Sequence, residues 1–203
     1  MVGDRLILGW AGMDWAYEQT PPGTVFSINA RTGEREWTFQ ALSDEVREQS
    51  GTANVWTHMS ADEELGLVYL PVSSPSPNFW GGNRTEEVPL ATSTTALDIE
   101  TGEVVWSRQW VHHDIWDYDI NAAPTLMDIT VDGEEIPALI QATKMGFCLS
   151  LTVKPAKTCG RLRSVRYRKG MVILKVRFMP LPSLSQPSRH HCLISQKNLR
   201  FGR

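Results

Sequence analysis

A run of histidine, acidic and aromatic residues stands out at positions 112–119, where the sequence reads HHDIWDYD. Histidine and aspartate are the residue types that bind zinc, so a metal site is the first chemistry to consider. Zinc needs three or four ligands that meet in space, and adjacent residues on a strand point to opposite faces. His112 and His113, with Asp114 and Asp119, therefore give little support for a zinc site.

No other enzyme signature is present in the 203 residues. The sequence lacks a glycine-rich phosphate loop, a GxSxG nucleophile turn and an HExxH zinc motif. Cys148, Cys159 and Cys192 are too few and too scattered for a disulfide framework or a zinc knuckle. No stretch approaches 18 consecutive apolar residues, and the first residues do not have the pattern of a signal peptide. We therefore expect neither a signal peptide nor a membrane segment in this chain.

Charge is distributed very unevenly along the sequence. Residues 1–149 hold all 23 acidic residues and seven of the 20 basic ones, whereas residues 150–203 hold 13 basic residues and no acid. The formal net charge of −3 hides this division. All eight tryptophans also precede residue 117. The sequence thus predicts a body over residues 1–148 and a basic tail over residues 149–203.

The body is predicted to be β structure, because short runs of β-branched and aromatic residues recur between turn signals with a period close to two. One short helix is expected at Ser43–Gln49, where serine precedes an acidic first turn. Asp132-Gly133 indicates a hairpin, since glycine supplies the positive φ of a tight turn. The expected strands are Leu6–Trp10, Thr24–Ile28, Arg35–Gln40, Leu67–Val72, Thr94–Asp98, Val104–Gln109, Thr125–Val131 and Pro137–Ala142.

A repeat lies within the body at an offset of 69 residues, where SINARTGEREW (27–37) matches ALDIETGEVVW (96–106). Each copy reads as a strand, a turn at Asn29 or Asp98, a Thr-Gly corner and a strand that ends in tryptophan. Such repeats are typical of the radially arranged sheets of a propeller, although two unrelated hairpins with the same turn chemistry would look alike. Since a propeller needs roughly four to eight blades, we expect the body to be part of a larger one.

The strings ARTGEREW and DIETGEVVW resemble the tryptophan-docking repeats of dehydrogenases that depend on pyrroloquinoline quinone (PQQ). The stretches GLVYLPVSSPSPNFWGGNRT, WSRQWVHHDIWDYDINAAPTL and IQATKMGF resemble the membrane-bound quinoprotein glucose dehydrogenase branch, so that the likeness covers residues 1–148. This resemblance implies an all-β fold, with two to three blades of an eight-bladed β-propeller in this chain. It also implies a quinone and a Ca²⁺ or Mg²⁺ ion near the propeller axis.

The resemblance assigns chemistry to three residues. Asp117 matches the catalytic aspartate, which would accept the hydroxyl proton of the substrate as hydride leaves carbon. Lys144, 27 residues later, matches the cation that contacts the quinone oxygens and would stabilise negative charge there. Trp56 matches the tryptophan on which the flat cofactor stacks. Each also has an ordinary interpretation, as a loop acid, a surface lysine and a core indole.

Three further residues are matched less specifically. Ser76 falls where the family places an oxygen ligand near the metal, although a lone hydroxyl is a weak ligand for a hard cation. His112 and His113 would support the base or face the substrate, and structural hydrogen bonding explains them equally well. The main acidic metal ligand of the family is not matched, and we therefore do not expect a complete quinone site from this chain alone.

The body thus resembles part of a quinoprotein dehydrogenase that oxidises a sugar or an alcohol by hydride transfer to PQQ. By the same resemblance, the intact enzyme would lie at the periplasmic face of the inner membrane and pass electrons to a membrane quinone. The alternative is a non-catalytic propeller scaffold of the outer-membrane assembly type. Such a scaffold would keep the repeats but would not need Trp56, Asp117 and Lys144 together.

The tail over residues 149–203 is predicted to be disordered or the product of a frameshift. The change in composition is abrupt, and no Thr-Gly…Trp repeat follows it. One strand-like run, Met171–Phe178, carries charges at Lys175 and Arg177. The alternative is a genuine basic arm that binds polyanions such as nucleic acid. We expect no nucleic-acid partner for the enzyme itself.

Overall fold

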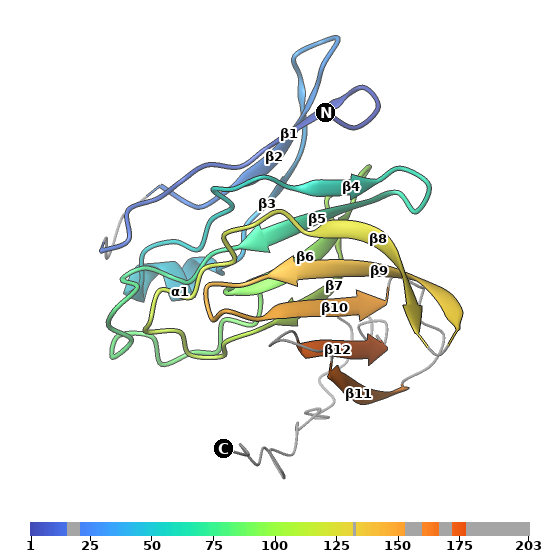
Figure 1. Ribbon diagram of the computed structural model, residues 1–203. Coiled ribbons are helices and arrows are strands. Elements are labelled where there is room, and N and C mark those ends of the chain that lie inside the picture. The colour runs from blue at the N-terminus through green and yellow to red at the C-terminus, as the bar shows by residue number, and fades with distance from the viewer. Residues whose placement is uncertain (16–20, 132, 153–159, 167–171, 178–203) are drawn as a thin grey trace.

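The computed structural model describes residues 1–15, 21–131, 133–152, 160–166 and 172–177, which form three β-sheets and one short helix (Figure 1). None of these residues belongs to a helix long and apolar enough to cross a membrane. The helix is α1 (Asp44–Gln49). The strands are β1 (Arg5–Leu8), β2 (Val25–Asn29), β3 (Arg35–Phe39), β4 (Ser60–Asp62), β5 (Leu67–Val72), β6 (Ser93–Asp98), β7 (Val104–Gln109), β8 (Thr125–Val131), β9 (Glu134–Ala142), β10 (Cys148–Thr152), β11 (Gly160–Arg166) and β12 (Val172–Arg177).

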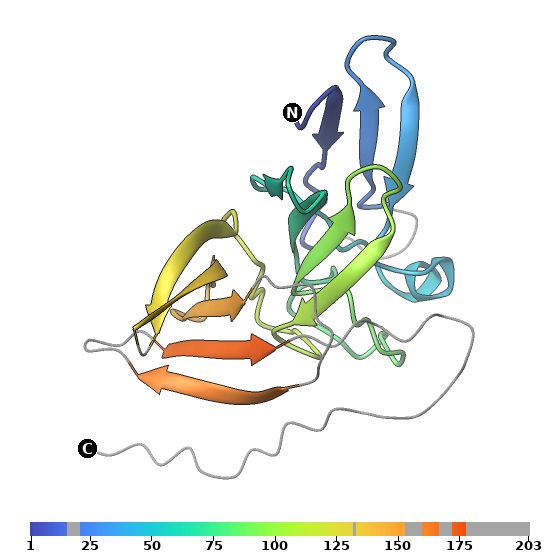
Figure 2. The same cartoon turned by 90° about the vertical axis from the view of Figure 1, so that its right-hand side faces the viewer.

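Each sheet is built mainly from strands that follow one another in the sequence. The orders are β1-β2-β3, β4-β5-β6-β7 and β11-β12-β10-β9-β8. Neighbouring strands are antiparallel, except that β10 and β12 are parallel. Figure 2 shows the three sheets fanned out next to one another rather than merged into one layer. The architecture is therefore all-β, and its three sheets match the predicted two to three blades of a propeller.

The sequence repeat is also a structural repeat. Its two copies form the last two strands of their sheets, β2–β3 and β6–β7. In each copy, the side-chain oxygen of Asn29 or Asp98 accepts backbone N–H groups two and three residues further on, at 2.8–3.1 Å. Gly33 and Gly102 follow with φ angles of 77° and 73°, a backbone conformation that favours glycine. The shared position in the sheets explains the repeat better than two unrelated hairpins do.

Trp37 joins the first sheet to the second. Its indole is 7% exposed, and Nε1 donates a hydrogen bond of 2.9 Å to the carbonyl oxygen of Ile99. The indole also packs on Gly102, where a Cβ atom would come within 2.6 Å of the ring. The turn glycine is thus required twice, for its positive φ and for the close approach of the tryptophan.

Strand β5 distributes its side chains between two hydrophobic cores. Val68, Leu70 and Val72 lie in the core shared with Trp37, whereas Tyr69 lies in a second core with Trp106. The Tyr69 and Trp106 ring centroids are 5.8 Å apart. This second core also includes residues of β9 and β10, Leu139 and Leu151. Because alternate residues of a strand point to opposite faces, one apolar strand joins all three sheets.

The structure confirms the predicted helix and each of the eight predicted strands: three strands have the predicted bounds, and no end of the others differs by more than three residues. Ser43 caps α1 by accepting a hydrogen bond from the Val46 amide. The predicted hairpin joins β8 to β9, and Gly133 has a φ of 83°, while Asp132 lies outside the described residues. The short strand β4 was not predicted.

The predicted boundary between body and tail falls at the first residues of β10. Strand β10 pairs with β9 from Cys148 to Thr152, so the third sheet continues past residue 148. Strands β11 and β12 lie within the predicted tail, and β12 covers most of the strand-like run noted in the sequence. Strand β12 pairs with β10 through Leu151 and Val176. The rest of the tail lies outside the described residues, and the division into body and tail stays a prediction.

Candidate active site

A cavity of about 330 Å³ lies where loops from all three sheets meet. The loops follow β1, α1, β5, β7 and β9, so the residues that line this one cavity come from distant parts of the sequence. The polar and aromatic groups that matter for chemistry in its wall are Asp14, Trp56, Asn78, Asp119 and Lys144. Two of these, Trp56 and Lys144, were predicted from the sequence as cofactor-binding residues.

Lys144 and the predicted base Asp117 are in direct contact. The Lys144 ammonium Nζ lies 3.0 Å from Asp117 Oδ2 and 3.2 Å from Asp119 Oδ2. Partial burial acts to lower the pKa of Lys144, but the hydrogen bonds and negative charges of Asp117 and Asp119 outweigh it, so the pKa is raised above its ordinary value. Lys144 therefore stays positively charged at physiological pH.

Asp117 is held from both sides of its carboxylate. The side-chain amide of Asn78 donates a hydrogen bond of 2.7 Å to Oδ1, while Lys144 occupies Oδ2. The backbone at Asp117 has a φ of 57°, which is uncommon for a residue other than glycine. The side chain is 23% exposed, so the carboxylate stays accessible although its direction is set.

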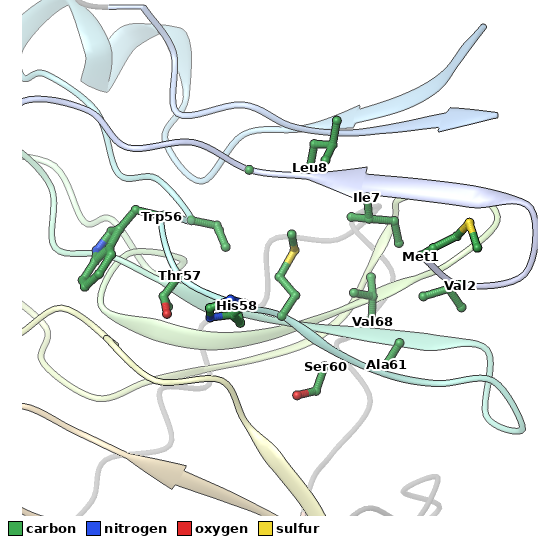
Figure 3. A pocket seen from close by; sticks show the side chains of 13 residues that line it. Met1, Val2, Ile7, Leu8, Trp56, Thr57, His58, Ser60, Ala61 and Val68 are labelled. Atoms are coloured by element: carbon green, nitrogen blue, oxygen red, sulfur yellow. The ribbon is translucent and has the colours of Figure 1, made fainter. Parts of the chain in front are cut away.

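Trp56 presents an indole face beside this cation. Its side chain is 42% exposed, and Lys144 Nζ lies 5.9 Å from the ring centroid. Nε1 donates to Asp119 Oδ2 at 3.2 Å, which fixes the plane of the ring. The same residue also lines a second cavity of about 550 Å³ between β1 and the segment leading to β4, where Figure 3 shows the indole at one end. An exposed, oriented indole next to a cation is suited to stacking a flat anionic ligand.

Asp119 is the residue that sequence reasoning considered only as a zinc ligand and then set aside. Its carboxylate is buried and accepts four hydrogen bonds: the amide and hydroxyl of Ser74 reach Oδ1 at 2.7 and 2.8 Å, and Trp56 and Lys144 reach Oδ2. Asp119 therefore connects the two predicted cofactor residues. The sequence shows an acid two residues after Asp117, but the contacts of Asp119 with Ser74 and Trp56 arise only in the folded chain.

Asp14 is a second acid that the sequence reasoning did not single out. It lines the cavity, and its backbone carbonyl accepts a hydrogen bond from the Asn78 amide at 2.8 Å. Burial raises the pKa of the Asp14 carboxyl, and the negative charges of Asp117 and Asp119 raise it further. The loop after β1 therefore adds a carboxylate to a wall that is already rich in oxygen atoms.

Oxygen donors of this kind suit a hard divalent cation such as Ca²⁺ or Mg²⁺. Asp14 and Asp117 offer carboxylate oxygens, whereas Asn78 directs the NH₂ group of its side chain toward Asp117. In the described part of the chain, no three side chains of His, Cys, Asp or Glu converge into a metal site. The donor chemistry fits such a cation, provided that neutral oxygens complete the set.

Ser76 and the two histidines occupy different positions around this site. Ser76 lines the cavity but is buried, and its Oγ accepts a hydrogen bond of 2.8 Å from the Thr52 amide. His112 and His113 are exposed, and the partners of Asp117 among the described residues are Asn78 and Lys144. The ligand role of Ser76 and the supporting role of the histidines stay predictions.

Comparison with known proteins identifies the family. The profile described as "PQQ: Glucose/ethanol/alcohol dehydrogenase, beta-propeller domain" matches residues 1–153. The chain belongs to this family. Among its relatives is the quinoprotein glucose dehydrogenase of Escherichia coli K12, 41% identical over 133 residues that cover 61% of this chain and 17% of the relative. The quinoprotein glucose dehydrogenase of Gluconobacter oxydans 621H is 32% identical over 158 residues, which cover 72% of this chain and 20% of that relative. The chain thus spans about a fifth of the length of these relatives.

Solved structures share the fold of this PQQ dehydrogenase domain. The quinohemoprotein alcohol dehydrogenase ADHIIG of Pseudomonas putida HK5 superposes with a TM-score of 0.64 at 22% identity, over 86% of this chain and 29% of that one. A europium-containing methanol dehydrogenase superposes with a TM-score of 0.63 at 22% identity, over 75% of this chain and 31% of that one. These matches confirm that the three sheets are part of a β-propeller.

Proposed function

We propose that the protein carrying this chain oxidises a sugar or an alcohol and that Asp117, Lys144 and Trp56 form part of its PQQ site. One observation carries the proposal: three loops from distant parts of the chain bring a carboxylate, a cation and an exposed indole face into one cluster. When bound, PQQ supplies the two-electron acceptor for the hydride that leaves the substrate.

Asp117 acts as the base in this proposal. Its Oδ1 and Oδ2 atoms are held by Asn78 and Lys144, so the carboxylate points in a fixed direction and needs little reorientation when it takes the hydroxyl proton.

Lys144 and Trp56 bind the cofactor. The Lys144 ammonium provides positive charge where reduction places negative charge, and its position is set by two carboxylates before any ligand arrives. Trp56 provides the flat surface for stacking. A divalent cation would be held beside the base by oxygen atoms of Asp14 and Ser76, and would supply Lewis-acid polarisation.

The membrane branch of this family suggests where the protein works. We infer a position at the periplasmic face of the inner membrane and a membrane quinone as the next electron acceptor, in line with the quinoprotein glucose dehydrogenases to which the chain is similar. A non-catalytic propeller scaffold gives no reason for the contact between Lys144 and Asp117, and this contact favours the enzyme.

The proposal is tested in a graft enzyme, in which residues 1–148 replace the matching segment of the Escherichia coli relative. We expect PQQ-dependent sugar oxidation in the parent graft. Lys144→Met should lower kcat by roughly 10²–10³-fold, because it removes a preorganised charge from the reacting oxygens. Lys144→Arg should lower kcat less, because arginine keeps the positive charge. Turnover that needs neither PQQ nor Lys144 would contradict the proposal.

A further inference from the structure

Arg84 is a buried arginine that lies outside the cavity and has no part in the chemistry proposed above. Its side chain is 4% exposed, which is unusual for a residue that carries a permanent charge. It belongs to the long connection between β5 and β6, six residues after Asn78. A charge buried this deeply needs compensating contacts, and those of Arg84 reveal what it does.

The guanidinium binds the backbone of two different loops. Nη1 donates to the carbonyl oxygens of Pro75, Pro77 and Trp80 at 3.1–3.3 Å, so it fixes the loop that carries Asn78. Nη2 donates to the carbonyl oxygen of Asp114 at 2.6 Å, at the start of the loop that carries Asp117. Arg84 is therefore a bridge of hydrogen bonds between the two loops whose side chains meet at the base.

Asp114 extends this bridge toward Asp117. Its carboxylate is 1% exposed and accepts backbone hydrogen bonds from Trp116 at 2.9 Å and Tyr118 at 3.0 Å. These bonds enclose residue 117 on both sides and hold the turn in which Asp117 has a positive φ. Negative charge on Asp114 also offsets the buried charge of Arg84.

We propose that Arg84 is a positioning residue, which holds the Asp117 loop against the Asn78 loop and so sets the 2.7 Å contact that orients the base. A side chain with one donor direction cannot do this, because four carbonyl oxygens in two loops must be reached at once. The planar fork of guanidinium donors can reach them. This inference rests on the proposed function, because it assigns Arg84 a role in the orientation of the base.

The test compares Arg84→Ala and Arg84→Lys in the graft enzyme loaded with PQQ. Arg84→Ala should lower kcat by roughly 10–100-fold, the size of effect expected when a reacting group is misplaced by about 1 Å. KM and the amount of bound PQQ should stay close to those of the parent graft, because the cavity wall keeps its cofactor residues. Arg84→Lys should have a similarly low kcat, because an ammonium group lacks the planar set of donors that reaches all four carbonyl oxygens.

Added guanidinium chloride separates positioning from general stability. Guanidinium at concentrations well below those that unfold the protein should raise the kcat of Arg84→Ala with saturation, because the ion can occupy the space left by the side chain. A protein that is merely destabilised would lose activity in the same denaturant. Arg31→Ala, at an arginine whose side chain is 75% exposed on a distant turn, is the matched control and should show neither loss nor rescue.

Three results would overturn the inference. Arg84→Ala with parental kcat would show that the bridge does not orient the base. A loss of kcat in proportion to lost PQQ, without rescue by guanidinium, would show that Arg84 only supports the fold. A parent graft without PQQ-dependent turnover would overturn the proposed function and this inference with it, whereas the first two results leave the proposed function standing.

Discussion

At the scale of single residues, Asp119 shows how the site is organised before any ligand binds. Its two carboxylate oxygens accept hydrogen bonds from Ser74, Trp56 and Lys144. Each of these groups comes from a different loop, so one buried acid determines the relative positions of the indole plane and the ammonium. Hydrogen bonds to a charged group are stronger than neutral ones, which makes a carboxylate suitable for this task.

Asp119→Asn should weaken PQQ binding without removing the base. One carboxylate oxygen becomes an NH₂ group, which cannot accept hydrogen bonds from Trp56 and Lys144. The loss of charge-assisted bonds costs about 1.5–3 kcal/mol, or roughly 10–100-fold in the Kd for PQQ. Quenching of tryptophan fluorescence by PQQ in the graft enzyme measures this Kd. Asp128→Asn, on an exposed residue of β8, is the control, and an unchanged Kd in Asp119→Asn would show that the acid is dispensable.

The sequence could identify Asp117, Lys144 and Trp56 because they stand in strings with a recognisable pattern. It could not identify Asp14, since an acid in a loop of mixed composition is usually a solvated residue. Asp14 and Asn78 can act in the site only because they line the cavity that forms when the loops after β1 and β5 come together. Arg84 was visible only as part of a matched string, because the four carbonyl oxygens that it binds carry no signal in the sequence.

At the scale of elements, the Thr-Gly turns determine how one sheet meets the next. The turn at Asp98 places Ile99 and Gly102 under the indole of Trp37. Hydrogen bonds from Thr101 and Glu100 lower the pKa of Asp98 below its ordinary value. Such an acid stabilises the fold fully above its unfolded-state pKa of about 3.9, and this contribution is lost as the pH falls through the lower folded-state pKa.

Asp98→Ala should therefore loosen the 96–106 hairpin by about 1–2 kcal/mol, since it removes the acceptor for two backbone amides and the Thr101 hydroxyl. Asp98→Asn keeps an oxygen acceptor and should lose less stability. The protection of its hairpin against hydrogen exchange should also depend less on pH in the acidic range. Hydrogen exchange of this hairpin in the graft enzyme, corrected for the intrinsic exchange rate, measures both effects. The 27–37 hairpin has uncharged Asn29 in the same place and is the internal control. Equal protection in Asp98→Ala and the parent would contradict the prediction.

Most strands could be predicted because their apolar residues alternate or run together between clear turns. Strand β4 could not, because Ser60–Asp62 has three residues and no apolar pattern, and it pairs with β5 through its backbone. Strand β10 begins where the acidic composition of the body ends, and composition alone does not show that it completes a sheet with β9. Which strands belong to one sheet, and the role of Trp37 between sheets, follow from packing rather than from local sequence.

At the scale of the whole molecule, the described residues form three neighbouring sheets, and the chain spans about a fifth of its relatives. A propeller buries the faces of its sheets by closing into a ring, and three sheets do not close one. Of the described strands, β1 and β3 form the edges of the first sheet, with backbone groups open to further pairing.

The 203-residue chain by itself should consequently not form an active holoenzyme when PQQ and Ca²⁺ are added. Open sheet edges favour association between copies, so we expect aggregates rather than monomers. Size-exclusion chromatography and a dye-linked sugar oxidation assay check both points. The graft enzyme is the positive control, and a monomer of the isolated chain with sugar-oxidising activity would refute this expectation.

The central claim is that Asp117 is the base of a PQQ-dependent dehydrogenase, and the kcat of Asp117→Asn in the PQQ-loaded graft enzyme tests it most directly. The amide keeps the shape of the side chain and can still accept the hydrogen bond from Asn78, but it cannot take a proton. We predict that PQQ binding is retained and that kcat falls by roughly 10²–10⁴-fold. A variant that binds PQQ and keeps more than about a tenth of the parental kcat would contradict the assignment of Asp117 as the base.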